Sequence, residues 1–230
     1  GATGISGGAG GDTLLNHGDL TATADGTATS SGLSVSFPLL ELAGVGKWWN
    51  DFPPAIAVTT SGRLAQAHAA GIASGAGDDT VINATGAGEL LDVDATAVAN
   101  TNQAALVLQN LKTAGGGKPY YLNLDIALAN ASAHAASQAV GVDGEGGDDF
   151  LQNLGDVRVA ADASAVGNAA SVSVAGLKGM TGLGVALVEA KVDSQAAAAA
   201  VGLDGGAGDD SVDNGGPLTV DAHAFTNSLA

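Results

Sequence analysis

The chain contains no cysteine and has few aromatic or basic residues. Among its 230 residues 3% are aromatic, and 7 Lys plus Arg stand against 24 Asp plus Glu. Disulfide bonds are therefore excluded. A formal net charge of -17 at pH 7 argues against binding to nucleic acid phosphates and makes cations the expected partners. No apolar run is long enough to predict a membrane-spanning helix.

Glycine and alanine take the place of the missing large side chains. Gly occurs 36 times and Ala more often still, so a hydrophobic fraction of 46% buries little area per residue and favours thin, closely stacked layers. Intrinsic disorder is not expected, because the chain is rich in Val and Leu as well as Ala. Residues 1–4 lack the basic start of a signal peptide, and no initiator Met is present. We interpret the chain as a processed product or a piece of a longer protein.

One thirteen-residue segment occurs four times. The copies begin at Gly4, Gly71, Gly141 and Gly202 and read GISGGAGGDTLLN, GIASGAGDDTVIN, GVDGEGGDDFLQN and GLDGGAGDDSVDN. They predict a single repeat domain over residues 1–230, with repeats at 4–70, 71–140 and 141–201 and a partial repeat at 202–230. Residues 37–54 form an excursion that breaks the repeat.

Two alternating tracts accompany each segment. Small or aliphatic residues fall on every second position of the outbound tract, as in 91–99, and of the return tract, as in 127–135. A period of two predicts strands. The second copy needs four extra residues, 85–88, to keep this pattern in phase.

We therefore expect an all-β protein, a β-solenoid built from repeats of about 65 residues. Each repeat forms one wide coil or two narrower ones, with neighbouring coils about 4.8 Å apart. The alternative is a mixed solenoid with Ala-rich helices in the return tracts. It is favoured by Asp193, Ser194 and Gln195 followed by five Ala, which is typical of a capped helix start.

The repeated segment resembles the Gly-Gly-x-Gly-x-Asp-x-U-x nonapeptide of calcium-binding RTX proteins, in which U is aliphatic. Residues 7–15 and 205–213 match throughout, whereas 74–82 and 144–152 depart at one early Gly. RTX domains repeat the nonapeptide in tandem, but here each copy stands alone. The resemblance implies a bacterial protein at the cell surface or outside the cell, with Ca²⁺ held between successive coils by carboxylates and Gly-segment carbonyls. The candidate ligands are Asp12, Asp78, Asp79, Asp148, Asp149, Asp209, Asp210, Gly8, Gly10, Gly75, Gly77, Gly146, Gly206 and Gly208.

The negative charge of these loops predicts calcium binding without reference to the RTX resemblance. Stacked aspartates at one corner of a solenoid repel one another, and Ca²⁺ relieves the repulsion while taking six to eight oxygen ligands. The other interpretation is a tight acidic turn in which Gly supplies positive φ and Asp makes local hydrogen bonds.

The turns between outbound and return tracts collect basic and aromatic residues. Lys112 and Lys178 fall there, and so do the candidate partner-binding residues Lys47, Trp48, Trp49, Tyr120 and Tyr121. These residues suit lateral contact with other copies or with polysaccharide. Alternatively, the lysines simply protect exposed turns.

No catalytic motif is found, and we expect no enzyme. The leading hypothesis is an extracellular structural protein, a calcium-stabilised β-solenoid that forms or belongs to a filament. The alternative is a calcium-dependent cell-surface adhesin module that binds glycan or a host surface. Self-assembly head to tail is expected, because the tract at 218–230 has no return tract to follow it.

Overall fold

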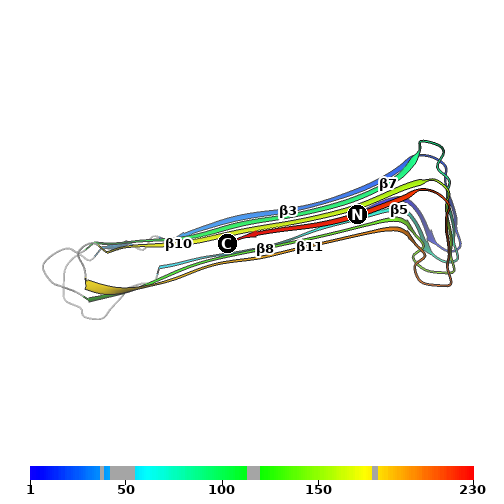
Figure 1. Ribbon diagram of the computed structural model, residues 1–230. Helices are drawn as coiled ribbons and strands as arrows, with labels where there is room; N and C mark the ends of the chain where they lie inside the picture. Colours follow the sequence, from blue (N-terminus) through cyan, green and yellow to red (C-terminus); the bar gives the residue numbers. More distant parts are fainter. Residues whose placement is uncertain (37–38, 42–54, 113–119, 178–180) are drawn as a thin grey trace.

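The computed structural model is an elongated all-β slab and describes residues 1–36, 39–41, 55–112, 120–177 and 181–230 (Figure 1). These residues form strands and turns, with no helix among them. The strands are β1 Ala2–Ala9, β2 Thr13–Asn16, β3 Leu20–Ser36, β4 Leu39–Glu41, β5 Ala55–Ala76, β6 Thr80–Asn83, β7 Leu90–Lys112, β8 Tyr120–Asp143, β9 Phe150–Asn153, β10 Asp156–Leu177, β11 Thr181–Asp204, β12 Ser211–Asn214 and β13 Leu218–Leu229. The all-β prediction is confirmed.

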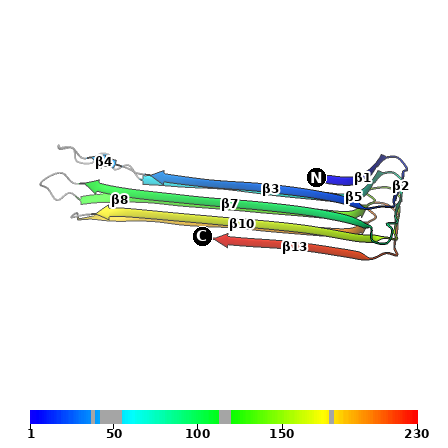
Figure 2. The same cartoon turned by 90° about the horizontal axis from the view of Figure 1, so that it is seen from above.

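Three parallel sheets make up the slab. The return sheet has the order β1-β5-β8-β11, the outbound sheet the order β13-β10-β7-β3 with β4 beside β7, and the short end sheet the order β12-β9-β6-β2. The return and outbound sheets lie face to face along the slab, and the end sheet closes one end (Figures 1 and 2). Each pass of the chain runs through a return strand, a short end strand and an outbound strand, so it makes one wide coil.

Strands of successive passes pair at matching positions of the repeated segment. Ile5 pairs with Ile72, and Asn83 pairs with both Asn16 and Asn153. The extra residues of the second copy lie in a turn before β7 that includes Gly88, at a φ of 88°. This turn absorbs the insertion, so Leu91 still pairs with Leu20 on one side and Val157 on the other.

Small side chains fill the space between the two long sheets. Buried alanines alternate along the facing strands, among them Ala67, Ala97, Ala133 and Ala163. The sheets approach so closely that a Cβ added to Gly26 in the outbound sheet would lie 2.1 Å from the carbonyl oxygen of Gln66 in the return sheet. Alanine and glycine are therefore required here by the separation of the layers.

The alternative of Ala-rich helices in the return tracts is wrong. Residues 196–200 belong to β11, which pairs with β8 in parallel. Ala196, Ala198 and Ala200 pack against the core between the sheets, while the residues between them face outward. The helix preference of Ala is small per residue, and the strand ladder together with burial of one face overrides it.

A polar layer crosses the interior between two apolar clusters. Gln103 accepts a hydrogen bond from the Thr59 hydroxyl and donates one to the Ser61 hydroxyl at 2.6 Å. Thr101 donates to the carbonyl oxygen of Ser132 at 2.9 Å. These bonds join the outbound sheet to the return sheet, so they fix how the two sheets align along their length.

Candidate metal site at the loop end

The repeated Gly/Asp segments lie together at the loop end of the slab, between the return sheet and the end sheet (Figure 1). Their backbones turn through positive φ at two positions in each pass. These positions are Gly8 and Gly10, Gly75 and Gly77, Glu145 and Gly147, and Gly206 and Gly208. The predicted turns with left-handed glycines are therefore present in all four copies.

Gly146 occupies a different position from the other candidate glycines. It bridges to Ala76 and to Ala207 in the neighbouring passes, whereas the left-handed glycine of its own pass is Gly147, at a φ of 137°. Glu145 takes the other left-handed position, at a φ of 61°, where the remaining copies have glycine. Aligning the four copies by position identifies Glu145 and Gly147 as the two residues with positive φ. Because two glycines are adjacent at 146–147, the glycines alone do not show which one is left-handed.

Four candidate aspartates form an inner column along the stack. Asp12 donates its backbone N–H to Asp79 Oδ1 at 2.7 Å, Asp79 donates to Asp149 Oδ1 at 2.8 Å, and Asp149 donates to Asp210 Oδ1 at 3.0 Å. Asp79 and Asp149 are almost fully buried. Each of the three accepting carboxylates thus holds the pass before it in register.

The other three aspartates form an outer, solvent-exposed column. Asp148 donates its backbone N–H to Asp78 Oδ1 at 3.0 Å, and Asp209 donates to Asp148 Oδ1 at 2.9 Å. The direction is opposite to that of the inner column, because here each carboxylate bonds the pass that follows. Two ladders of amide-to-carboxylate hydrogen bonds therefore run along the corner, and their donors point in opposite directions along the stack.

In three of the four inner carboxylates, Oδ2 is buried without a hydrogen bond. This holds for Oδ2 of Asp12, Asp79 and Asp149. Burial raises the pKa of Asp149; the backbone N–H of Asp79 opposes this shift, and the charges of Asp79, Asp210 and Asp78 add to it. At Asp149, burial and the neighbouring carboxylates therefore both disfavour the ionised form.

Backbone carbonyl oxygens of the adjacent pass lie near two of these carboxylates. A Cβ added to Gly144 would lie 2.2 Å from the carbonyl oxygen of Gly205 and 2.7 Å from Asp149 Oδ2, so the close approach of both oxygens requires glycine at this position. Gly7 stands in the same relation to the Ser74 carbonyl oxygen and Asp12 Oδ2. Carboxylate and carbonyl oxygens are the donors that Ca²⁺ prefers. By type of donor, the residues fit calcium.

The second pass differs, because Ser74 replaces this glycine. Its hydroxyl donates to the carbonyl oxygen of Gly144 at 2.8 Å. Within the described ranges, no group of three or more His, Cys, Asp or Glu side chains could hold a metal ion. A cation at this corner would accordingly use backbone carbonyls in addition to the Oδ2 atoms.

A ladder of asparagines, which we did not predict, lies one strand beyond the aspartates. Asn16 donates its side-chain N–H to Asn83 at 2.8 Å, Asn83 donates to Asn153 at 2.8 Å, and Asn153 donates to Asn214 at 2.7 Å. The signal in the sequence is that every copy of the segment ends in Asn. Asn83 and Asn153 both donate and accept along the stack, so their buried amides are satisfied and the register is fixed.

Of the candidate partner-binding residues, the structure describes the backbone of Tyr120 and Tyr121. Lys47, Trp48 and Trp49 lie outside the described residues. Tyr120 and Tyr121 begin β8, at the opposite end of the slab from the Gly/Asp segments. This position agrees with the expectation that the aromatic turns and the acidic loops lie at opposite ends of the long strands.

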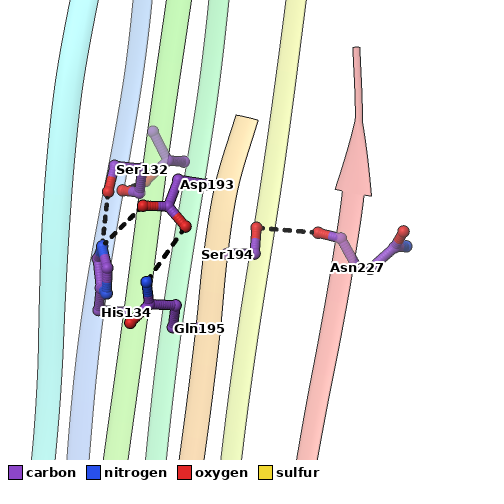
Figure 3. A network of polar contacts seen from close by, with 7 residues as sticks. Ser132, His134, Asp193, Ser194, Gln195 and Asn227 are labelled. Atoms are coloured by element: carbon purple, nitrogen blue, oxygen red, sulfur yellow. Dashed lines mark hydrogen bonds and ion pairs between the residues drawn. The ribbon is translucent and has the colours of Figure 1, made fainter. Parts of the chain in front are cut away.

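A Ser–His–Asp cluster lies on the outer face of the return sheet (Figure 3). His134 Nε2 is 2.8 Å from the Ser132 hydroxyl and 3.9 Å from Asp193 Oδ2. A nucleophilic triad requires the serine and the carboxylate to bond different ring nitrogens. Here the same nitrogen faces both groups, so the cluster lacks the geometry of a proton relay.

Comparison with known proteins identifies no relative: no family model, no curated protein and no solved structure matches the chain. None of the described segments is a helix with the length and apolarity needed to cross a membrane.

Proposed function

We propose that this protein is an extracellular structural protein, a calcium-stabilised β-solenoid of repeats of about 65 residues whose copies continue one another's sheets to form a filament. The observation that carries the proposal is that each pass binds the next through the same residues and in the same direction. The asparagine ladder runs from Asn16 to Asn214, and every step donates toward the later pass. The first pass of a following copy offers Asn16 Oδ1 in the position that would accept from Asn214.

The strand edges support the same continuation. In the outbound sheet Leu20 pairs with Leu91, Leu91 with Val157, and Val157 with Leu218. A following copy would therefore place Leu20 beside Leu218 without a change of register. Open head-to-tail contacts of this kind generate filaments rather than closed rings.

Calcium would supply the positive charge that the aspartate corner lacks. Its ligands would be drawn from Asp12, Asp79 and Asp149 through their unpaired Oδ2 atoms, together with neighbouring carbonyl oxygens. Sites built on few carboxylates with backbone oxygens bind Ca²⁺ weakly, as extracellular modules do. In a filament the corner of each copy would meet that of the next, so the same cation would act at the joints.

A proline in β13 tests the filament. Val157 donates its N–H to the Pro217 carbonyl oxygen, and backbone groups of a parallel strand alternate between its two neighbours. The N–H of Val220 therefore faces away from β10, toward the strand of a following copy. Val220→Pro removes that donor and leaves the internal ladder intact, whereas Val220→Thr is the matched control.

Filament formation is measured by sedimentation velocity and electron microscopy in the presence of calcium. Filaments are expected for the unmodified chain and for Val220→Thr, and short or absent filaments for Val220→Pro with an unchanged circular dichroism spectrum. An unmodified chain that stays monomeric at high concentration with calcium present would overturn the proposal.

A further inference from the structure

The outer face of the return sheet is free of formal charge over most of its area. The outward positions of β5 from Ile56 to His68, and of β8 from Ile126 to Gln138, include no Asp, Glu, Lys or Arg. Ile56, Val58 and Leu64 are about half exposed there. Arg63 lies in the inward-facing phase, where it donates to the Thr29 carbonyl oxygen of the outbound sheet at 3.3 Å. In a chain of net charge -17, two adjacent strands without an acid on their outward positions are unexpected.

The outer face of the outbound sheet has the opposite character. Its outward positions carry Asp25, Asp92, Asp94, Asp162 and Asp221. Arg158 is the cation among them, and it bonds Asp92 at 2.7 Å and Asp94 at 3.2 Å. Two outbound faces would therefore repel each other, while two return faces would not.

We propose that the return face is the site at which a second copy of this chain packs, face to face, with both acidic outbound faces turned to solvent. Thirteen residues on each of β5, β8 and β11 span roughly 43 Å by 14 Å, or about 600 Å² per copy, and β5 and β8 supply the uncharged two thirds of this area. Two such faces bury about 1,200 Å², which reaches the size of a specific interface. The charge distribution favours this pairing, since the other long face, that of the outbound sheet, carries Asp25, Asp92, Asp94, Asp162 and Asp221.

Charged residues border this face rather than interrupt it. Glu189, Lys191 and Asp193 lie on β11, the last strand of the return sheet. Their exposed positions beside an apolar centre give the polar rim and uncharged core of an ordinary protein interface. The contact is independent of the end-to-end contact proposed above, because it uses side chains of the face and not the strand edges.

Two matched valines provide the test. Val58 on the return face and Val172 on the outbound face are both strand residues with 48% of their surface exposed. Each is changed to Asp in the Val220→Pro background, which keeps failure of the lateral contact separate from failure of the filament. Leu64→Asp, at a residue 60% exposed on the return face, is a second variant in case Val58→Asp does not fold.

Sedimentation equilibrium of these proteins gives the dimer dissociation constant. The Val220→Pro chain should form dimers; Val58→Asp and Leu64→Asp should raise the dissociation constant by more than about tenfold, because each buries an unpaired carboxylate. Val172→Asp should leave the dissociation constant unchanged. The proposal is wrong if the Val220→Pro chain remains monomeric at high concentration, or if Val172→Asp weakens the dimer as much as the return-face variants do.

Discussion

The loop end and the alanine slab repeat the same passes but are stabilised in different ways. In the slab, small apolar side chains such as Ala97 and Ala163 pack between two sheets and carry no polar atoms. At the loop end, buried carboxylates and amides form ladders from pass to pass, as Asp79 does with Asp149 and Asn83 with Asn153. The slab thus supplies apolar burial, and the corner supplies register.

This division leads us to expect that the stability of the loop end depends on ions and that of the alanine slab does not. A sheet of alternating alanines is compatible with a shift of two residues, because alanine would still meet alanine. A ladder of Asn and Asp side chains permits one alignment only. The cost is a column of carboxylates with unpaired Oδ2 atoms, and a cation is the simplest way to offset it.

The largest effect is expected from breaking the asparagine ladder. Asn83→Ala removes a fully buried amide that bonds both Asn16 and Asn153, and it leaves those partners unsatisfied. The free energy of unfolding should fall by about 2 to 4 kcal/mol, measured by chemical denaturation. The control is Asn102→Ala, which removes an exposed bond to Asn168 and should change stability by less than about 0.5 kcal/mol. Equal effects of the two variants would show that the buried ladder has no special role.

Overpacking the slab should have the next largest effect. Ala97→Leu introduces three carbons into a fully buried position between two closely spaced sheets, which should cost about 1 to 3 kcal/mol. Ala136→Leu adds the same atoms on the outer face of the return sheet and should change the free energy of unfolding little. If Ala97→Leu proves neutral in a denaturant titration, the layers are not as close as their alanine content indicates.

The aspartate column should respond to pH in the absence of divalent ions. Because burial raises the pKa of Asp149 above its unfolded value, its ionised form destabilises the fold near neutral pH. Stability in chelator should therefore rise as the pH falls through the raised pKa of the folded state. Asp149→Asn keeps an acceptor for the Asp79 N–H and removes the charge.

The variant should melt at a higher temperature than the unmodified chain in chelator at pH 7, and it should show a smaller rise on acidification. Its response to added calcium should also be smaller. Thermal melts at several pH values, with chelator or with calcium, measure all three. A variant that melts below the parent in chelator would mean that the carboxylate is not a source of repulsion.

The smallest effect concerns the acidic outbound face. Arg158→Ala removes ion pairs with Asp92 and Asp94 that are largely exposed, so the loss should not exceed about 1 kcal/mol and should shrink in high salt. Arg63→Ala is the comparison, because Arg63 bonds a backbone carbonyl of Thr29 and its loss should depend less on salt. Denaturation at low and high salt distinguishes the two arginines.

The sequence predicts the strands and the stacking of the Gly/Asp segments, because alternation and an ungapped repeat are properties of the chain itself. It leaves the return tracts ambiguous, since five consecutive alanines are compatible with helix until the core on one side of β11 is known. The asparagine ladder depends on which residues meet across passes, and so does the uncharged surface formed by the adjacent strands β5 and β8. Calcium, self-assembly and the role of Trp48 and Trp49 stay predictions.

The most direct test of the account is the melting temperature of the unmodified chain in excess chelator, in millimolar calcium and in magnesium. A cation that binds only the folded aspartate corner stabilises it by mass action. The melting temperature should therefore be clearly higher in calcium than in chelator, with magnesium a poor substitute because it requires stricter octahedral geometry. Identical melting temperatures in calcium and in chelator would contradict a cation-stabilised corner.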